Sequence, residues 1–489
     1  MPNSTHRPFD LHAAARAALQ KYQLATDLPA DAARQLATLT HSQPAVPDTP
    51  AADLRDLLWS SIDDDTSRDL DQIEVADRVS TGTRVRVGVA DVDVLVGKGS
   101  PLDQSAARNS TTVYTGVDTF PMLPIELSTD RTSLAPNQDR WALIVEFVVA
   151  PDGSTTGATI YRAVVRNHAQ LAYDSVGAWL SGKGPAPASI AANSALAEQL
   201  RLQSATAQSL RQRRAQRGAL DLETIEAAPV EGNGTVVDLR AVQASPARDL
   251  IEDFMIAANA VIATFLTARG RTSIRRVVRT PTRWPRIVEL AGTFGITLPA
   301  EPDGHALAAF LDARRAADPA SFPDLSLAVI KLLGPGEYEM ERPGDVGTGH
   351  FGLAVPDYTH GTAPNRRYAD LVTERLLKAA ISGAPAPYTD DELAAIAAHC
   401  TTQEDNARHA TRFVHKQAAA VLLASRVGQV FDGVVTGVTD GGTFARVFSP
   451  PVEGRIMHGS AHLDVGDQVR VRLLSTDPAR GFIDFEAMS

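Results

Sequence analysis

The segment from Ser61 to Glu74 places six acidic residues within fourteen positions, and this density constrains the fold more than any other feature of the chain. Carboxylates a few ångströms apart repel one another, and each raises the pKa of its neighbours unless a cation offsets the charge. Asp63, Asp69 and Asp71 are joined by a short turn, so they can converge on one or two divalent ions. A ligand set made only of oxygen atoms suits Mg²⁺, Mn²⁺ or Ca²⁺ rather than zinc.

The acidic segment has two other interpretations. It can be a solvated turn that caps a helix, or the calcium-binding loop of an EF-hand that begins at Asp63. That loop needs glycine for its sharp turn at the position of Arg68, and it should lead into a helix. Residues 84–96 instead carry β-branched side chains at alternate positions, which indicates a strand. The sequence therefore disfavours the EF-hand.

Length and composition describe a globular protein of several domains. A chain of 489 residues is too long for one ordinary core, so about two to four domains are expected. The only cysteine, Cys400, excludes an intramolecular disulfide and a cysteine-based zinc site, which fits a reducing cytosol. The N-terminal residues lack the layout of a signal peptide, and no uninterrupted apolar run reaches membrane-spanning length. We expect a cytoplasmic protein that does not bind membranes.

Arginine is concentrated in two runs that contain no acidic residue. The net charge of −11 on its own argues against a nucleic-acid ligand. Residues 201–217 nevertheless contain five arginines, and residues 269–286 contain seven, among them Arg275 and Arg276. A phosphate-binding channel needs local strips of this kind, whatever the global charge. The first run can also be the solvated face of a helix, whereas the second is a candidate phosphate contact.

The sequence divides into three parts. Residues 9–22 and 28–39 indicate two alanine-rich amphipathic helices in an N-terminal unit, residues 1–45, which is either a helix-turn-helix or a packing arm. A proline-rich linker at 43–50 precedes a mixed α/β body at 51–425. In this body we expect strands at 84–96, 142–150 and 157–166, helices at 249–263, 366–381 and 390–421, and linkers at 182–200 and 382–390.

Residues 428–489 differ in character from the rest of the chain. They contain five short strand-like segments separated by Gly, Asp and Pro turns, which suit a small closed barrel of the OB type. Phe431, Phe444 and His458 can form a stacking face for bases, with Arg446 beside it. One or two of these aromatic residues can instead belong to the core of the barrel.

A second polar cluster extends from Tyr358 to Asp370. Pro364 stands where a loop would enter a helix, with Arg366 and Arg367 in the first turns. A helix N-terminus beside guanidinium groups is an anion site. An acidic metal cluster together with such an anion site meets the needs of metal-assisted phosphodiester hydrolysis. The alternative is that these arginines only pair with acidic neighbours.

The sequence offers little sign of a nucleotide cofactor. It contains no Gly-x4-Gly-Lys-Ser/Thr phosphate loop and no His-Glu-x-x-His metalloprotease helix. Residues 347–352 fit the glycine pattern of dinucleotide-binding proteins, but the required preceding strand and following helix are missing. We therefore expect no nucleotide cofactor.

A series of sequence blocks follows one another along residues 51–489: Ser61–Gln72, Val89–Val92 with Gly99–Asp103, Phe120–Ser128, Arg217–Asp221, Leu250–Asn259, His350–Leu353 and Tyr358–Asp370. Their order is that of the ribonuclease II / ribonuclease R family, which this chain resembles. Its last part is similar to the S1-type OB domain that ends those enzymes. The resemblance implies an α+β multidomain protein with a mixed α/β RNB-type catalytic body (51–425), the small N-terminal helical unit and a C-terminal five-stranded OB β-barrel (428–489).

The resemblance also implies an activity: Mg²⁺-dependent hydrolytic 3′→5′ digestion of single-stranded RNA to nucleoside 5′-monophosphates by a monomer. Asp63, Asp69 and Asp71 match the family's catalytic, metal-binding carboxylates, and Arg366 matches its arginine near the scissile phosphate. Tyr114 matches the aromatic residue that stacks near the 3′-terminal nucleotide. Mn²⁺ is expected to substitute for Mg²⁺.

Three departures from the family pattern bear on this expectation. Gln72 stands where the family has a fourth aspartate, so one Mg²⁺ is expected and the second is open. The block from Thr362 to Arg367 lacks a hydroxyl and an apolar anchor, and the helical unit stands where the family carries cold-shock domains. A catalytically weak relative that binds RNA is therefore the second interpretation of the chain. A Ca²⁺-binding or structural protein is the third.

Overall fold

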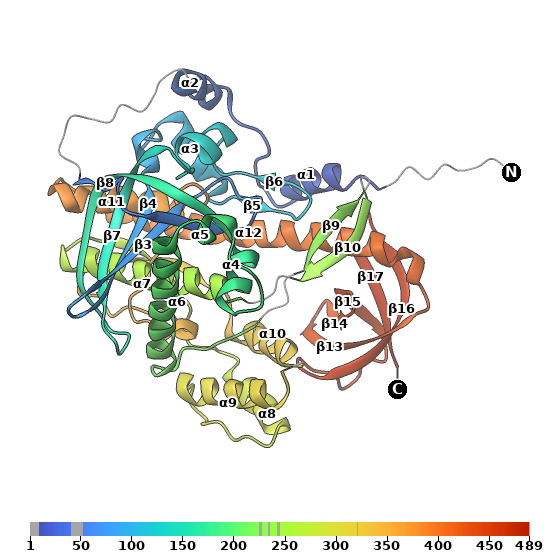
Figure 1. The fold of residues 1–489 in the computed structure, drawn as a ribbon. Coiled ribbons are helices and arrows are strands. Elements are labelled where there is room, and N and C mark those ends of the chain that lie inside the picture. Colours follow the sequence, from blue (N-terminus) through green and yellow to red (C-terminus); the bar gives the residue numbers. More distant parts are fainter. Residues whose placement is uncertain are drawn as a thin grey trace.

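The computed structural model describes residues 9–40, 52–223, 227–232, 235–241, 245–319 and 321–488. A central sheet is surrounded by helices, a barrel lies at the C-terminus, and three helices lie next to that barrel (Figure 1). The α+β architecture expected from the sequence is therefore confirmed. The predicted linker at 43–50 lies outside the described residues.

A six-stranded sheet forms the centre of the body, with the strand order β1-β8-β2-β3-β4-β7. β3, β4 and β7 are antiparallel neighbours, whereas β2 runs parallel to β8. The three predicted strands are confirmed, although the first ends early because the 3-10 helix Val92–Val94 follows it. The strands are β1 Ala52–Asp53, β2 Trp59–Asp63, β3 Gln72–Val79, β4 Gly82–Ala90, β7 Asp139–Val149 and β8 Thr155–Ala172.

The helices around the sheet include the three that the sequence predicts. α7 (Pro246–Ala268) begins at Ser245, whose hydroxyl caps the N–H of Arg248. It is long and apolar enough to cross a membrane, but 67% of its most apolar window is buried in this fold. The expected linker at 182–200 is wrong in its second half, because Asn193 caps a helix there. The other helices of the body are α3 Pro101–Asn109, α4 Tyr173–Leu180, α5 Ala188–Ala191, α6 Ser194–Ala215, α11 Tyr368–Ser382 and α12 Asp390–Leu423.

The two predicted N-terminal helices form, but they pack on different elements. α1 (Leu11–Lys21) lies against the C-terminal half of α12, where Leu19 shares a core with Val414. α2 (Ala30–Thr40) contacts α3 instead. Because a helix-turn-helix needs its two helices packed on each other, this arrangement is that of a packing arm.

The C-terminal barrel closes in the order β13-β14-β15-β17-β16. Its strands are β13 Val430–Thr439, β14 Gly442–Phe448, β15 Pro451–His458, β16 Gln468–Asp477 and β17 Phe482–Met488. Helices α8 (Trp284–Thr293), α9 (Gly304–Ala317) and α10 (Phe322–Leu333) enclose a hydrophobic core of their own, which reaches Val465 of the barrel. The barrel is thus attached to the body through both α10 and α12.

Three two-stranded sheets complete the described structure. They are formed by β5 Val113–Tyr114 with β6 Thr119–Phe120, β9 Ala227–Gly232 with β10 Thr235–Ala241, and β11 Ser273–Val277 with β12 Glu337–Glu341. β11 carries Arg275 and Arg276 of the second arginine run, so their surroundings are set by the pairing with β12.

Candidate active site

Asp71 lies at the centre of a buried polar cluster, directly before β3. Its side chain is only 1% exposed. One carboxylate oxygen accepts a hydrogen bond from the backbone N–H of Asn365 (2.9 Å), and the other accepts from Nε of Arg366 (3.1 Å). Burial raises the pKa of Asp71 to about 7, although the charge of Arg366 opposes the shift. A carboxylate in such a place gains from a nearby cation.

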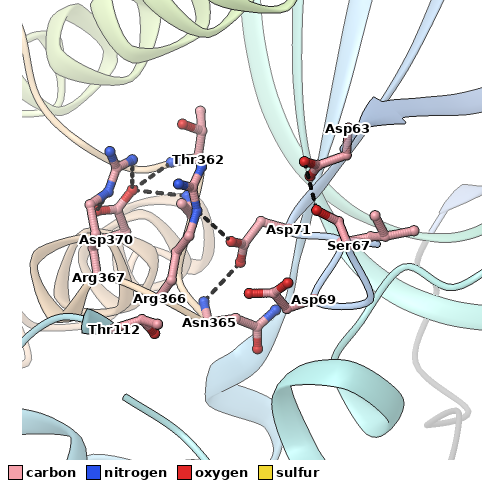
Figure 2. A network of polar contacts seen from close by, with 12 residues as sticks. Asp63, Ser67, Asp69, Asp71, Thr112, Thr362, Asn365, Arg366, Arg367 and Asp370 are labelled. Carbon is pink, nitrogen blue, oxygen red and sulfur yellow. Dashed lines mark hydrogen bonds and ion pairs between the residues drawn. The ribbon is translucent and has the colours of Figure 1, made fainter. Parts of the chain in front are cut away.

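The segment before α11 brings Arg366 to Asp71. The carboxylate of Asp370, in the first turn of that helix, accepts from the N–H groups of Thr362 and Ala363 (both 2.9 Å) and from the guanidinium of Arg367. These bonds fold the segment back over the helix start (Figure 2). The prediction that the two arginines lie inside the helix is wrong, since α11 begins after them at Tyr368. The N–H groups of Thr362, Ala363 and Asn365 already donate to carboxylates, so Arg366 rather than these N–H groups is left as a donor for an anion.

Asp63 and Asp69 lie on the other side of Asp71, as Figure 2 shows. Asp63 ends β2, and its Oδ1 accepts from the backbone N–H of Asp64 (2.7 Å) and from the hydroxyl of Ser67 (2.9 Å). Asp69 accepts a hydrogen bond from the hydroxyl of Tyr114 (3.3 Å). The three predicted carboxylates, Arg366 and Tyr114 therefore lie at one place, although they come from three segments of the chain. The segment leads into strand β3, so the EF-hand interpretation is wrong.

The donor set at this place fits a divalent ion that the substrate helps to bind. Among the described residues, no three His, Cys, Asp or Glu side chains form a metal cluster on their own. Mg²⁺ commonly takes one or two carboxylates and completes its shell with substrate phosphate oxygens and water. Asp63, Asp69 and Asp71 offer only oxygen ligands, and burial raises the pKa of Asp63 as well as that of Asp71. A divalent ion would offset the charge that burial makes costly here.

Comparison with known proteins assigns this architecture to a family. The RNB domain family matches residues 51–383, and the family described as RNase II-type exonuclease C-terminal S1 domain matches residues 429–488. The chain belongs to the RNB family. Nucleases of this family depend in general on a divalent metal ion, which agrees with the oxygen-rich donor set.

Relatives and solved structures are similar to this chain over more than nine tenths of its length. Ribonuclease R 1 of Lactococcus lactis is 27% identical over 500 residues, which cover 96% of this chain but 60% of that protein. The chain thus spans less than two thirds of that relative. Mycoplasma genitalium RNase R in complex with ribose methylated single-stranded RNA has a TM-score of 0.86 at 23% identity and covers 98% of this chain and 78% of its own. Yeast Ssd1, a pseudonuclease, has a TM-score of 0.68 at 17% identity, covering 92% of this chain and 56% of its own.

Gln72, which the resemblance places at the position of the family's fourth aspartate, is the first residue of β3 and is 7% exposed. Two residues further along that strand, Glu74 is 1% exposed, and its Oε1 has no hydrogen-bond partner among the described residues. Burial raises the pKa of Glu74 well above its usual range, and the charge of Asp63 adds to this shift. A buried carboxylic acid to which sequence reasoning assigned no role therefore lies beside the acidic cluster.

The other arginines predicted to bind RNA are engaged within the protein. Arg275 is 2% exposed, and its Nε donates to Glu341 (3.0 Å). Arg276 donates to Glu404 and lies over the ring of Tyr338. For these two residues the prediction of an RNA contact is wrong, because each guanidinium is consumed by a carboxylate. Arg367 is likewise held by its ion pair with Asp370, which is the alternative interpretation of that arginine.

The three residues of the predicted stacking face of the barrel lie in three different environments. Phe431 is 9% exposed and packs on Phe485 in the barrel core, so its predicted contact with bases is wrong. Phe444 is half-buried, and Nζ of Lys416 from α12 lies 5.3 Å from its ring centroid. His458 is exposed at the end of β15. Phe444 and His458 remain predictions as RNA contacts.

Sequence reasoning gave Asn365 no role, and it did not name Asp370 as the acidic partner of Arg367. The backbone of Asn365 holds Asp71 across 294 positions of sequence, and its Oδ1 accepts from the hydroxyl of Thr132 (2.5 Å). No local signal could reveal contacts of this range. Asp370 follows Arg367 by three residues, a spacing typical of ion pairs on a helix surface, so its pairing with that arginine was accessible from sequence.

Proposed function

We propose that this RNB protein is a Mg²⁺-dependent hydrolytic 3′→5′ exoribonuclease that degrades single-stranded RNA to nucleoside 5′-monophosphates. The observation that carries the proposal is the contact of Arg366 with Asp71, 3.1 Å, at a buried acidic cluster. Carboxylates for a metal ion and a guanidinium for the phosphate are the two charges that phosphodiester hydrolysis requires. The relatives named Ribonuclease R, and the RNase R structure solved with single-stranded RNA, support the choice of substrate.

Each residue of the site has a distinct task in this proposal. Arg366 keeps 42% of its side chain exposed, so it can donate to the non-bridging phosphate oxygens while Asp71 holds its Nε. Asp63, Asp69 and Asp71 would hold Mg²⁺, which when bound supplies an activated water and neutralises phosphate charge. Tyr114 is 47% exposed and would stack on the terminal base, with its hydroxyl anchored to Asp69.

A catalytically weak RNA-binding relative is the second candidate function. Gln72 favours it, because a neutral amide replaces one carboxylate of the family's metal site. The likeness to yeast Ssd1, a pseudonuclease, is a reminder that the RNB fold also occurs without nuclease activity. In this case the protein would retain RNA at the same site without cutting it.

One assay separates the two functions. A 5′-labelled single-stranded oligoribonucleotide is incubated with the protein in Mg²⁺, in Mn²⁺ and in EDTA, and the products are resolved by length. The exonuclease produces stepwise shortening from the 3′ end that stops in EDTA, and it leaves the corresponding DNA uncut. Retarded but intact RNA would favour the weak relative. The absence of any interaction with RNA would contradict both.

We further propose that the protein acts as a cytoplasmic monomer. Its only cysteine, Cys400, is 3% exposed within α12, so no surface thiol is available for an intermolecular disulfide. A single monomeric species in sedimentation at micromolar concentration is expected, whereas a stable dimer would contradict the proposal.

A further inference from the structure

The side chain of Asn365 carries a buried polar atom that the fold leaves without a partner. Asn365 stands directly before Arg366 and is only 1% exposed. Its backbone N–H donates to Asp71 (2.9 Å), but its Nδ2 has no hydrogen-bond partner among the described residues. In Figure 2 the carboxamide points toward Asp69. Because buried polar groups are nearly always hydrogen-bonded, this group indicates a role at the site.

The hydroxyl of Thr132 holds the other end of this carboxamide. Thr132 follows the π-helical turn Leu127–Arg131. Its Oγ1 lies 2.5 Å from Oδ1 of Asn365 and 2.8 Å from the carbonyl oxygen of Leu127. A hydroxyl has one proton, so it can donate to only one of these two oxygens at a time. With the amide in this orientation, one of the two contacts therefore has no proton, and Nδ2 has no acceptor.

A turn of the carboxamide by 180° supplies a proton to both contacts. The two ends of a side-chain amide have nearly the same shape, so the hydrogen bonds around them decide which end lies where. In the turned state the NH2 group of Asn365 donates to Oγ1 of Thr132, and the hydroxyl proton of Thr132 goes to Leu127. The carboxamide oxygen then faces Asp69. Because an amide oxygen and a carboxylate repel each other unless a cation lies between them, a divalent ion would stabilise this state.

The acidic cluster also needs an oxygen ligand beyond its carboxylates. Among the described residues, no three carboxylates lie closely enough to form a metal site on their own. The resemblance places the neutral Gln72 at the position of a fourth aspartate, and it places Asn365 where the family pattern has an apolar residue. Amide carbonyl oxygens suit Mg²⁺ and Mn²⁺ as carboxylates do. The burial of Asn365 is no obstacle, because Asp71 is equally buried at 1% exposure.

We propose that the carboxamide oxygen of Asn365 is a ligand of the divalent ion and compensates for the carboxylate that is missing at Gln72. The inference rests on the proposed function and adds one residue to its metal site. Thr132 is a positioning residue in this arrangement, because its hydroxyl holds the NH2 group and thereby directs the oxygen at Asp69. The backbone N–H of Asn365 meanwhile holds Asp71 (2.9 Å). One residue thus orients a carboxylate through its backbone and offers a ligand through its side chain.

The test measures the Mn²⁺ affinity of the whole protein without RNA. The protein is titrated with MnCl2, and free Mn²⁺ is followed by its electron paramagnetic resonance signal. Asn365→Leu removes the amide, has a similar size and keeps the backbone N–H. It should raise the dissociation constant by about tenfold or more, since the loss of a group that supports a metal site commonly costs 10–100-fold in affinity. Asn365→Asp keeps an oxygen but has no side-chain N–H, and it should bind Mn²⁺ at least as tightly as the parent.

A matched control makes the same change elsewhere in the chain. Asn406→Leu lies on α12, where the amide donates to Gln403 (2.9 Å), and it should bind Mn²⁺ as the parent does. Similar thermal midpoints in EDTA show that every variant is folded. Unchanged affinity in Asn365→Leu would overturn the inference, and so would equal weakening by Leu and Asp, which would show that the NH2 group is what matters. Either result leaves the proposed function intact if RNA is still shortened in Mg²⁺. A parent protein that binds no Mn²⁺ would contradict the metal-dependent function as well.

Discussion

Two pairs of adjacent arginines in this protein differ in whether a guanidinium group is left accessible to solvent. Arg275 and Arg276 lie on β11, where Glu341 and Glu404 neutralise them; Arg275 is buried and Arg276 keeps 11% of its side chain exposed. In the pair before α11, one arginine is fixed by Asp370, but Arg366 keeps its outer nitrogens accessible because Asp71 contacts only its Nε. The difference teaches that a guanidinium can bind a phosphate only where nearby carboxylates leave some of its N–H donors unbonded. The number of arginines in a stretch of sequence does not reveal which guanidinium groups keep available donors.

The largest effect is expected at Arg366. Arg366→Met should lower kcat for RNA hydrolysis by roughly 10²–10³-fold, the cost of removing one donor that stabilises charge in a transition state. Steady-state hydrolysis of a labelled oligoribonucleotide measures it, with the thermal midpoint as the check on folding. A variant that keeps wild-type kcat would show that the exposed guanidinium is not used.

The contrasting substitution is Arg275→Met. It should lower the free energy of unfolding by about 3 kcal/mol, because Glu341 would be left as a partly buried charge without its partner. Denaturant unfolding measures the loss, and the RNA affinity of the folded fraction should stay the same. Weakened RNA binding at unchanged stability would reverse the roles assigned to the two arginine pairs.

Asp71, the partner of Arg366, should make the free energy of unfolding depend on pH. Burial raises the pKa of Asp71 to about 7, so in the metal-free fold this group binds a proton that the unfolded chain releases at lower pH. Its stabilising contribution is complete below the unfolded pKa of about 4 and is lost as pH rises through 7, at up to about 1.4 kcal/mol per pH unit. Unfolding in EDTA at pH 5.5 and 6.5 should therefore show a larger decrease in stability for the wild type than for Asp71→Asn. Equal decreases would contradict the buried, protonated state.

The smallest effect is expected at Gln72. Gln72→Asp restores a carboxylate beside Asp71, so activity should be preserved or raised, and the Mg²⁺ concentration for half-maximal rate should not increase. A titration of the rate against Mg²⁺ measures this. A clear loss of activity would show instead that the amide itself has a positive role.

Much of the fold could be predicted from the sequence because its signals are local. The alternation in residues 84–96 marks β4, the apolar spacing of residues 249–263 marks α7, and the turn residues between short strands mark the barrel. The helix start at Ser194 was missed because residues 182–200 are rich in small residues, although Asn193 is a good N-cap.

The site could be predicted only where residue type and family pattern coincide. Asp63, Asp69, Asp71, Tyr114 and Arg366 do lie together. The failures at Arg275, Arg276 and Phe431 share one cause: their burial and pairing are decided by contacts with strands and helices distant in sequence, which no local pattern contains.

The most direct test of the account compares two aspartates of the same acidic segment. Asp71 is buried against Arg366, whereas Asp65 is exposed, so Asp71→Asn and Asp65→Asn remove equal charge from different environments. Stepwise shortening of 5′-labelled single-stranded RNA in Mg²⁺ should be abolished by the first substitution and unchanged by the second. Equal activity in the two variants would contradict a hydrolytic site centred on Asp71.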